Sequence, residues 1–377
     1  MKSPTEPDSL ATSSTHHHSI AEAIQPAVDR GLIAGAVVLA ATKDRVLALE
    51  AYGHADLAAQ KPMATDTLFW IASMTKPMTC TALMMLVDEG KVNVDDPVEK
   101  YLPEFAGQMM IAEKGDAHVL LKKPSHPIRV SEILSHTSGL AFSAPIEKPT
   151  FDLLRLRDSV RAHAMLPLEF EPGTKYQYSN AGTNTVGRIV EVVSGMPYEV
   201  FMDRRIFGPL GMDHTTFWPT EEQLPRIAKI YRVKEDKSGL EEATLAQLKY
   251  PFNDPKRKSM PAGGLFSTAS DCTKFCQMIL NGGELAGRRY LSEAAVRQMT
   301  TRQTPAHLEN NYGFGWDTSE GNFGHGGAYK THMVIDPRTG LITIFLVHHT
   351  NDWPHEDGKN LRTGFVAAAE KLVGMKV

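Results

Sequence analysis

Two pairs of short apolar segments stand near opposite ends of this chain of 377 residues. Their ranges are 34–41 and 46–52 near the N-terminus, and 328–335 and 341–348 near the C-terminus. Lys43-Asp44 joins the first pair, and Asp336-Pro337-Arg338-Thr339-Gly340 joins the second, so each pair predicts an antiparallel hairpin. Hairpins so far apart in the sequence can share one sheet only if the residues between them are looped out.

The residues between the hairpins carry helical patterns separated by loops rich in proline and glycine. The expected helices are an opening helix capped by Ser19 and ending near Gly31, segments at 79–89, 130–134, 151–164, 181–194 and 270–280, and a last helix at about 361–373. The predicted fold class is therefore α/β (α+β), an antiparallel sheet flanked by N- and C-terminal helices with a mostly helical inserted domain.

This architecture divides the chain into a mobile tail and two domains. The tail is 1–18, the sheet domain is 19–75 together with 262–377, and the helical domain is 76–261. A cleft between two such units is a natural place for a ligand, so we expect the active site there. Residues 105–128 and 215–260 are expected to shape the pocket, and they carry no readable motif.

The charge balance excludes some classes of partner. Forty basic and 44 acidic side chains give a net charge of -4, which favours neither nucleic acid nor an acidic membrane surface. No apolar stretch is long enough for a membrane span. No signal peptide is recognisable, so the expected location is cytoplasmic, or periplasmic or secreted if a leader has been removed. The oligomeric state is left open.

The cysteines do not indicate a metal or disulfide framework. Cys80, Cys272 and Cys276 are an odd number, and the latter two lie four residues apart in a predicted helix with no CxxC or HExxH nearby. We expect them to be small buried side chains, with no structural zinc. The triplet His16-His17-His18 is interpreted as part of the tail. No metal and no organic cofactor are expected.

One serine is placed where a nucleophile could be activated. No serine lies in a G-x-S-x-G elbow, but Ser73-Met74-Thr75-Lys76 directly precedes a helix that is apolar on every side. The spacing of three puts Lys76 on the same helical face as Ser73, near the positive end of the helix dipole. Burial could lower the pKa of Lys76 enough for it to act as a base. The alternative is a capped helix with a surface lysine.

Two further segments offer groups for acyl transfer. Tyr178-Ser179-Asn180 precedes a helix, and its phenol and amide can pass a proton and bind a carbonyl. Its alternative is a packed loop tyrosine with an asparagine that closes a turn. The second segment, 324–328, is Gly-His-Gly-Gly-Ala at a predicted edge strand, where a backbone N–H could serve an oxyanion hole. Its alternative is a bulge with an exposed histidine.

Taken together, the three segments resemble the serine β-lactamase and penicillin-binding-protein superfamily, in the class C β-lactamase-like branch and nearest to the family VIII carboxylesterases. The resemblance extends from Gly35 to about His348. It includes the segments Leu-Ser-His-Thr-Ser-Gly-Leu at 134–140, Pro-Leu-Gly-Met at 209–212 and Ala-Gly-Gly-Leu at 262–265.

The resemblance implies a role for each residue of the site. Ser73 would be the acylated nucleophile, Lys76 its proton partner, and Tyr178 the general base and then the acid for the leaving group. Asn180, His325, Gly326, Gly327 and Ala328 would bind substrate, and the N–H groups of Ser73 and Ala328 would form the oxyanion hole. His136 is interpreted as a structural histidine and Trp70 as a packing residue. Residues 312–316 are expected to form a strand near the site.

The sequence departs from the family pattern at His325, which stands where the family's K-T-G motif has its lysine. A fixed positive charge suits a substrate carboxylate, whereas imidazole is mostly neutral at pH 7. The expected activity is therefore hydrolysis of small to medium carboxylic esters through an acyl-Ser73 intermediate. The alternatives are a β-lactamase or D-alanyl peptidase, an acyltransferase with the same intermediate, and an acylated binding or sensor module that does not turn over.

Overall fold

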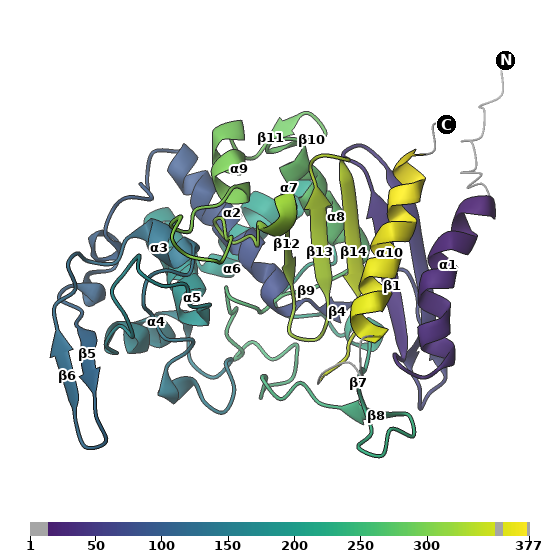
Figure 1. Cartoon of the computed structure of the whole chain (residues 1–377), viewed down its shortest axis with the longest axis horizontal. Coiled ribbons are helices and arrows are strands. Elements are labelled where there is room, and N and C mark those ends of the chain that lie inside the picture. Colours follow the sequence, from purple (N-terminus) through teal and green to yellow (C-terminus); the bar gives the residue numbers. More distant parts are fainter. Residues whose placement is uncertain (1–13, 351–356, 375–377) are drawn as a thin grey trace.

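The computed structural model describes residues 14–350 and 357–374 (Figure 1). Its α-helices are α1 Ser14–Asp29, α2 Thr75–Asp88, α3 Val130–Leu134, α4 Leu156–Ala164, α5 Asn180–Ser194, α6 Tyr198–Met202, α7 Gly208–Leu210, α8 Ala269–Leu280, α9 Glu293–Thr300 and α10 Asp357–Gly374. Its strands are β1 Gly35–Ala41, β2 Val46–Asp56, β3 Lys61–Pro62, β4 Phe69–Trp70, β5 Met110–Lys114, β6 Val119–Lys122, β7 Ile230–Val233, β8 Leu240–Ala243, β9 Phe266–Ser267, β10 Glu284–Leu285, β11 Arg288–Arg289, β12 Phe323–Gly326, β13 His332–Asp336 and β14 Leu341–Leu346.

Strands from both ends of the chain form one antiparallel sheet of six strands, in the order β12-β13-β14-β1-β2-β3. The two predicted hairpins are present as β1–β2 and β13–β14, and they meet where β1 pairs with β14, with Leu39 opposite Ile344. This pairing confirms the predicted α/β fold class, because most of the chain between the two hairpins is looped out of the sheet.

The central strand β1 is buried on both faces, which explains why its sequence is apolar throughout. Ala36, Val38 and Ala40 belong to a core cluster that includes Ile24 of α1 and Phe365 of α10. The alternate side chains of β1 point to the opposite face, where they join the larger core with residues of α2, α5 and α8. Figure 1 shows α1 and α10 side by side over one face of the sheet.

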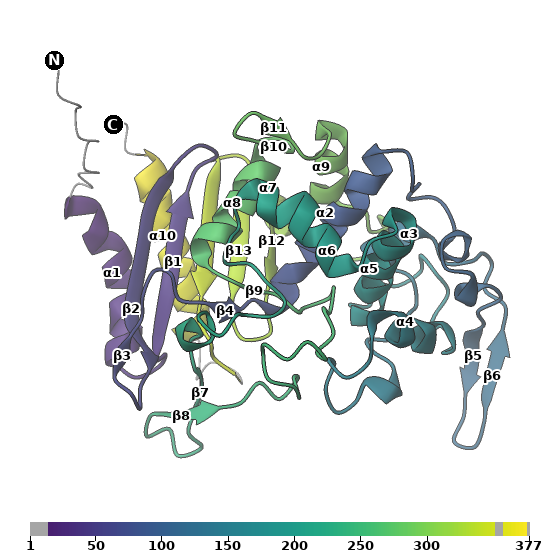
Figure 2. The ribbon, with the colours of Figure 1, turned by 180° about the vertical axis from the view of Figure 1, so that it is seen from behind.

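Helix α8 packs against β1 and β14. In Figure 2, α2, α3, α4 and α5 lie on the β12 side of the sheet, and the hairpin β5–β6 protrudes at the end farthest from α1. This hairpin and a second one, β7–β8, fall in segments for which the sequence had no readable motif. None of the helices in the described ranges is both long and apolar enough to cross a membrane.

The first helix begins earlier than predicted. It starts at Ser14 rather than after Ser19, because residues 14–18 contain no proline or glycine to end a helix. The helix overlaps residues 14–18 of the expected mobile tail, which otherwise stays a prediction, and residues 1–13 lie outside the described ranges. Cys80, Cys272 and Cys276 are free thiols buried in the core, as interpreted from their spacing.

Three segment boundaries also differ from prediction. The expected helix 151–164 begins only at Leu156, because the carboxylate of Asp152 accepts the backbone N–H groups of Lys249 and Tyr250 in a loop contact. The expected strand 328–335 begins at His332, since the Gly327 N–H closes a turn onto the carbonyl of Thr331. The expected strand 312–316 is instead a turn with only isolated bridges, which its glycines allow.

Candidate active site

Ser73 lies in a single turn of 3-10 helix, Ala72–Met74, that leads directly into α2. The turn is held from two sides: the Thr75 hydroxyl donates to the carbonyl of Ala72 at 2.7 Å, and the Ile71 N–H donates to the carbonyl of Leu265 at 2.9 Å. Helix α2 behind it is almost entirely buried and packs against α5. The half-buried serine therefore sits at the N-terminus of a central helix, as its sequence context predicts.

Lys76 reaches the serine from the first turn of α2. Its Nζ donates to Ser73 Oγ at 3.2 Å, to Asn180 Oδ1 at 2.8 Å and to the carbonyl of Ala262 at 2.7 Å. The side chain is fully buried. Burial disfavours the ammonium form and lowers the pKa of Lys76 to about 7. The alternative of a surface lysine is therefore wrong, and the amine is poised to hold or release a proton near neutral pH.

Tyr178 stands beside the same pair from the start of α5. Ser179 caps this helix through its hydroxyl, which accepts the N–H of Gly182 at 3.0 Å and so fixes the loop that carries Tyr178. The Tyr178 phenol faces the Ser73 hydroxyl, and the Lys76 amine lies 4.5 Å from the centre of the tyrosine ring. Burial raises the pKa of Tyr178, so the phenol keeps its proton at neutral pH.

Two asparagines one helical turn apart on α5 organise the opposite wall. Asn180 accepts from Lys76, and Asn184 accepts the N–H of Ala262 at 3.1 Å. The carbonyl of Ala262 in turn faces Lys76. The sequence identified Asn180 but gave Ala262 no individual role. A main-chain carbonyl is present in every residue, so the type of residue does not reveal its function, and Ala262 was noted only as part of the Ala-Gly-Gly-Leu segment.

His325 lies on β12, the edge strand next to the turn that carries Ser73. Its Nδ1 faces the carbonyl of Gly326 at 2.8 Å and therefore carries the proton, while Nε2 accepts from the Tyr312 hydroxyl at 3.1 Å. The side chain is buried, and burial lowers its pKa to about 3. The alternative of an exposed histidine on a bulge is wrong, and the imidazole is neutral at pH 7.

Gly326, Gly327 and Ala328 follow at the end of β12. A Cβ placed on Gly327 would lie 2.1 Å from Thr331 Oγ1 and 2.5 Å from the carbonyl oxygen of Ile71. Only glycine therefore allows this turn to approach the segment that leads to Ser73 so closely. Ala328 lines the same pocket as Ser73. Among the described residues its N–H has no hydrogen-bond acceptor, so it is free for a substrate oxygen.

We expect Gly327→Ala to lower kcat for ester hydrolysis by about 10² to 10³-fold, the loss measured when one oxyanion donor is removed. The added methyl group must push the turn away from Ile71, which displaces the Ala328 N–H relative to Ser73. Steady-state kinetics with a p-nitrophenyl ester measures the effect.

The matched control is Gly364→Ala in α10, where an added Cβ has its nearest neighbour at 3.7 Å. This variant should keep wild-type kcat. If Gly327→Ala keeps a kcat within about twofold of the wild type while it remains folded, the close approach at Gly327 has no catalytic importance.

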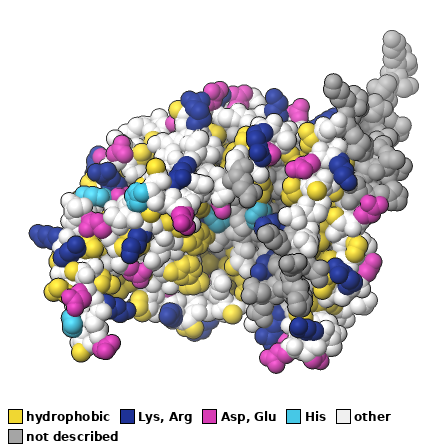
Figure 3. All heavy atoms as spheres, in the orientation of Figure 1, with side chains coloured by type: hydrophobic (Ala, Val, Ile, Leu, Met, Phe, Trp, Pro, Cys, Tyr) yellow, Lys and Arg dark blue, Asp and Glu magenta, His cyan; other side chains and the backbone are white. Residues whose placement is uncertain are grey.

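The pocket at Ser73 has about 400 Å³ of empty space, including its open mouth. Its lining combines apolar side chains with asparagine, glutamine and serine groups. The residues are Trp70, Ala72, Ser73, Ser143, Glu147, Phe151, Asn180, Asn184, Gln247, Met260, Ala262, Gly263 and Ala328. Figure 3 shows hydrophobic side chains gathered around a hollow near the centre of the face that it presents.

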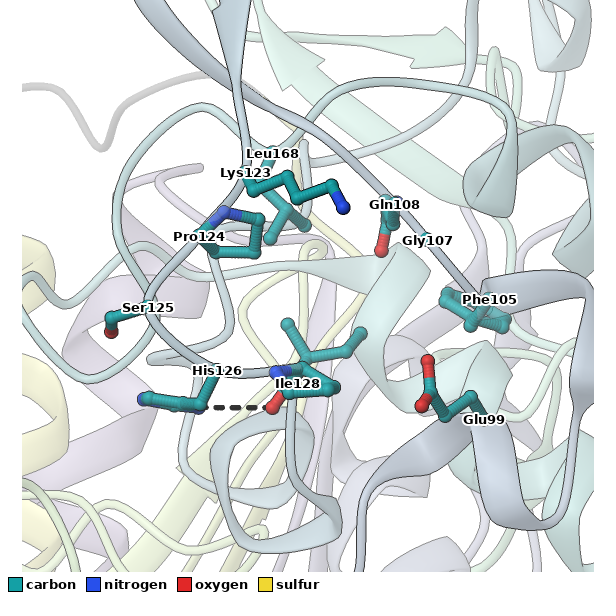
Figure 4. Close-up of a pocket in the computed structure, with 11 residues that line it drawn as sticks. Glu99, Phe105, Gly107, Gln108, Lys123, Pro124, Ser125, His126, Ile128 and Leu168 are labelled. Atoms are coloured by element: carbon teal, nitrogen blue, oxygen red, sulfur yellow. Dashed lines mark hydrogen bonds between the residues drawn. The ribbon is translucent and has the colours of Figure 1, made fainter.

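A second hollow of about 700 Å³ lies away from Ser73, near the base of the β5–β6 hairpin (Figure 4). Its polar groups include Glu99, Lys123 and His126. Ser125 in its wall donates its hydroxyl to Glu171, and His126 is turned toward the carbonyl of Pro127. No nucleophile and base are paired among the residues that line it, so the chemistry is expected at Ser73.

The structure thus brings Ser73, Lys76 and Asn180 into one hydrogen-bonded group, with Tyr178 beside it and His325 on the neighbouring strand. It also gives the aromatic contacts around the site, of which the sequence predicted only that residues 312–316 lie nearby. The His136 ring packs against Tyr178 and Tyr312, and Tyr176 contacts His136 and Tyr312. Trp70 lines the pocket as well as packing against Tyr329.

Known proteins are similar to this chain over most of its length. The beta-lactamase family model matches residues 20–368. Protein Rv1367c of Mycobacterium tuberculosis is 33% identical over 371 residues, which cover 87% of this chain and 89% of that protein. N-acetylmuramyl-L-alanine amidase of Bacillus subtilis is 28% identical over 378 residues, with 89% and 83% covered.

Among solved structures, EstCE1, a hydrolase with promiscuous acyltransferase activity, matches with a TM-score of 0.79 and 24% identity, covering 95% of this chain and all of that one. This likeness shows the fold, and the family match covers nearly the same residues. The chain therefore belongs to the β-lactamase family and is a hydrolase with the serine β-lactamase fold.

Proposed function

We propose that the protein is a carboxylesterase that cleaves small to medium, uncharged esters through an acyl-Ser73 intermediate. The observation that carries the proposal is the hydrogen bond of the Lys76 amine to Ser73, with the Tyr178 phenol beside them, in a pocket whose described lining residues include no lysine or arginine. The nucleophile and base support acyl transfer, and the absence of a cation from these walls supports a neutral substrate.

In the proposed acylation, neutral Lys76 takes the proton of the Ser73 hydroxyl as Oγ forms a bond to the ester carbonyl carbon. The N–H groups of Ser73 and Ala328 stabilise the carbonyl oxygen as it becomes negative. The bond to the alcohol oxygen then breaks, and Tyr178 gives that oxygen its proton. Lys76 returns a proton to Tyr178, so no net charge is left on the enzyme.

Deacylation repeats the sequence with water in place of the alcohol. The amine takes a proton from water as the oxygen attacks the acyl carbon, and Ser73 leaves with a proton from Tyr178. This assignment differs from the one that the family resemblance implies, where Tyr178 is the first base. Burial raises the pKa of Tyr178 and lowers that of Lys76, so the neutral phenol and neutral amine are the favoured starting pair.

Neutral His325 supports an ester over a substrate that carries a carboxylate. A lysine at this position would give such a substrate a fixed positive partner, whereas this imidazole has its pKa lowered to about 3 by burial. Glu147 also lines the pocket, but its carboxylate is paired with the buried amine of Lys258 at 3.0 Å, so it adds no unpaired charge to the wall. The proposal requires no metal and no organic cofactor.

A direct comparison of two substrates tests the preference. We expect kcat/KM for p-nitrophenyl butyrate to exceed that for a chromogenic cephalosporin by about 10²-fold or more, because the cephalosporin's carboxylate finds no cation in the pocket. His325→Lys should narrow this ratio. A cephalosporin turned over as fast as the ester by the wild-type enzyme would overturn the ester assignment while leaving Ser73 as nucleophile.

A second candidate is amide hydrolysis on a cell-wall peptide, which the name of the Bacillus subtilis relative favours. The same catalytic group can attack an amide, but an amine is a poorer leaving group than an alcohol and must be protonated by a general acid as the C–N bond breaks. Release of D-alanine or a muropeptide fragment by the purified enzyme would support it. Acyl transfer, the promiscuous activity of EstCE1, would give an ester product when an alcohol is added to the assay.

A further inference from the structure

His136 follows α3 within the Leu-Ser-His-Thr segment, and its backbone is left-handed, with φ of +60°. Few residues other than glycine adopt this conformation, and it costs on the order of 1 kcal/mol or more. The side chain is buried. A strained backbone at a buried polar residue next to the site requires a physical reason.

The backbone and ring of His136 hold the chain on both sides of Tyr178. The carbonyl of His136 accepts the N–H of Gln177 at 2.9 Å. Its ring Nδ1 accepts the N–H of Ser179 at 3.2 Å. One residue therefore binds the backbone N–H groups of the residues on either side of the tyrosine, Gln177 and Ser179.

The ring of His136 also sets the plane of the tyrosine. Its centre lies 4.5 Å from that of Tyr178 and 4.8 Å from that of Tyr312. Because Nδ1 accepts a hydrogen bond, the proton is on Nε2, and this nitrogen is buried without a hydrogen-bond partner among the described residues. Burial, with the nearby Lys76 and His325, lowers the pKa of His136, so the ring stays neutral.

We propose that His136 is the positioning residue for Tyr178, holding the phenol at hydrogen-bond distance from Ser73 while the reaction proceeds. The inference rests on the proposed function, because it assumes that Tyr178 transfers a proton. A side chain that merely filled the core would need no ring acceptor for the Ser179 N–H, and an apolar one would avoid the cost of a buried Nε2–H without a partner.

The proposal predicts a loss of kcat rather than of binding. His136→Ala removes the ring and the Nδ1 acceptor, so Tyr178 loses its fixed orientation, and we expect kcat to fall by about 30 to 100-fold with KM changed less than about threefold. In His136→Asn the side-chain oxygen takes the place of Nδ1, and asparagine tolerates the left-handed backbone. This variant should regain kcat to within about fivefold of the wild type.

A double-mutant cycle with Tyr178→Phe separates positioning from a general loss of stability. If His136 acts through the phenol, His136→Ala costs less than about threefold in a protein that already lacks the hydroxyl. Thermal unfolding of each variant shows which of them are folded. A folded His136→Ala enzyme with unchanged kcat, or losses that multiply fully in the double variant, would overturn the proposal.

The test also covers a His136→Ala variant that does not fold and a Tyr178→Phe variant that keeps its activity. If His136→Ala does not fold, the His136→Asn variant decides alone: a folded protein whose kcat is as low as that of Tyr178→Phe contradicts the positioning role. If Tyr178→Phe itself keeps wild-type kcat, the proposed chemistry fails, and the positioning role that rests on it fails as well. A fall for Tyr178→Phe without a fall for His136→Ala overturns only the positioning role.

Discussion

Ser73→Ala is expected to lower kcat/KM for p-nitrophenyl esters by about 10⁴-fold or more, to a level set by binding and the oxyanion hole alone. In the proposed mechanism the hydroxyl forms the acyl bond, and its removal leaves Lys76 and Tyr178 without a nucleophile. The same variant should lose labelling by a fluorophosphonate. Both are measured on protein of verified thermal stability.

The control for Ser73→Ala is Ser270→Ala in α8, a helix that packs against the sheet rather than at the pocket. This variant should retain both ester turnover and labelling. If Ser73→Ala keeps more than about a tenth of wild-type turnover, another nucleophile is at work and the assignment fails. If the wild-type protein is labelled in one burst but shows no steady turnover, it is an acylated sensor module and not an esterase.

Lys76→Met is expected to reduce kcat by about 10³-fold, within the range for removal of a general base. Methionine is unbranched and apolar, so it fills the buried space without an unpaired charge. The wild-type amine makes three hydrogen bonds at this position, and no other described amine lies within hydrogen-bond distance of Ser73 Oγ. Lys76→Arg should be no better, because a guanidinium does not give up its proton near neutral pH.

The pH dependence of the wild-type enzyme checks the same role. The amine must be neutral to accept the serine proton, and burial lowers its pKa to about 7. Activity is therefore expected to fall about tenfold per pH unit below this pKa and to level off above it. The other groups that face the amine do not titrate there: His325 has its pKa lowered to about 3, and Tyr178 has its pKa raised.

Two results would contradict the role of Lys76. One is a kcat/KM that is flat from pH 5 to pH 8 in the wild type, since a group with pKa of about 7 would then not be the base. The other is a Lys76→Met enzyme whose kcat/KM still rises with pH up to about 7 as in the wild type. A stable variant with unchanged kcat would assign the base to Tyr178 instead.

Much of the fold was predictable because its strongest constraints are local. Alternating apolar segments, a proline and glycine turn and an all-apolar helix each identify one element, and the pairing of β1 with β14 follows from the two hairpins. The hairpins β5–β6 and β7–β8 were missed because their strands are short and do not alternate apolar with polar residues, as Val-Leu-Leu-Lys in β6 and Leu-Glu-Glu-Ala in β8 show. The sequence predicted a strand from residue 328, where the structure has a turn. The pattern of apolar residues does not reveal the hydrogen bond from the Gly327 N–H to the carbonyl of Thr331 that closes this turn.

The candidate site was predictable where side-chain chemistry has a fixed spacing along the chain. Ser73 and Lys76 are neighbours on one helix, and Tyr178 and Asn180 flank a helix cap. His136 and Tyr312 could not be assigned, because their contacts with Tyr178 and His325 arise only when distant loops pack together. The left-handed backbone of His136 also has no signature in the residue types around it.

The most direct test of the acyl-Ser73 mechanism is mass spectrometry of enzyme quenched in acid during turnover of a slowly hydrolysed ester. The mechanism predicts a mass increase equal to the acyl group, confined to the peptide that contains Ser73 and absent in Ser73→Ala. An acyl group found on a different residue, or a quenched enzyme of unmodified mass under conditions where a burst of alcohol release is measured, would contradict it.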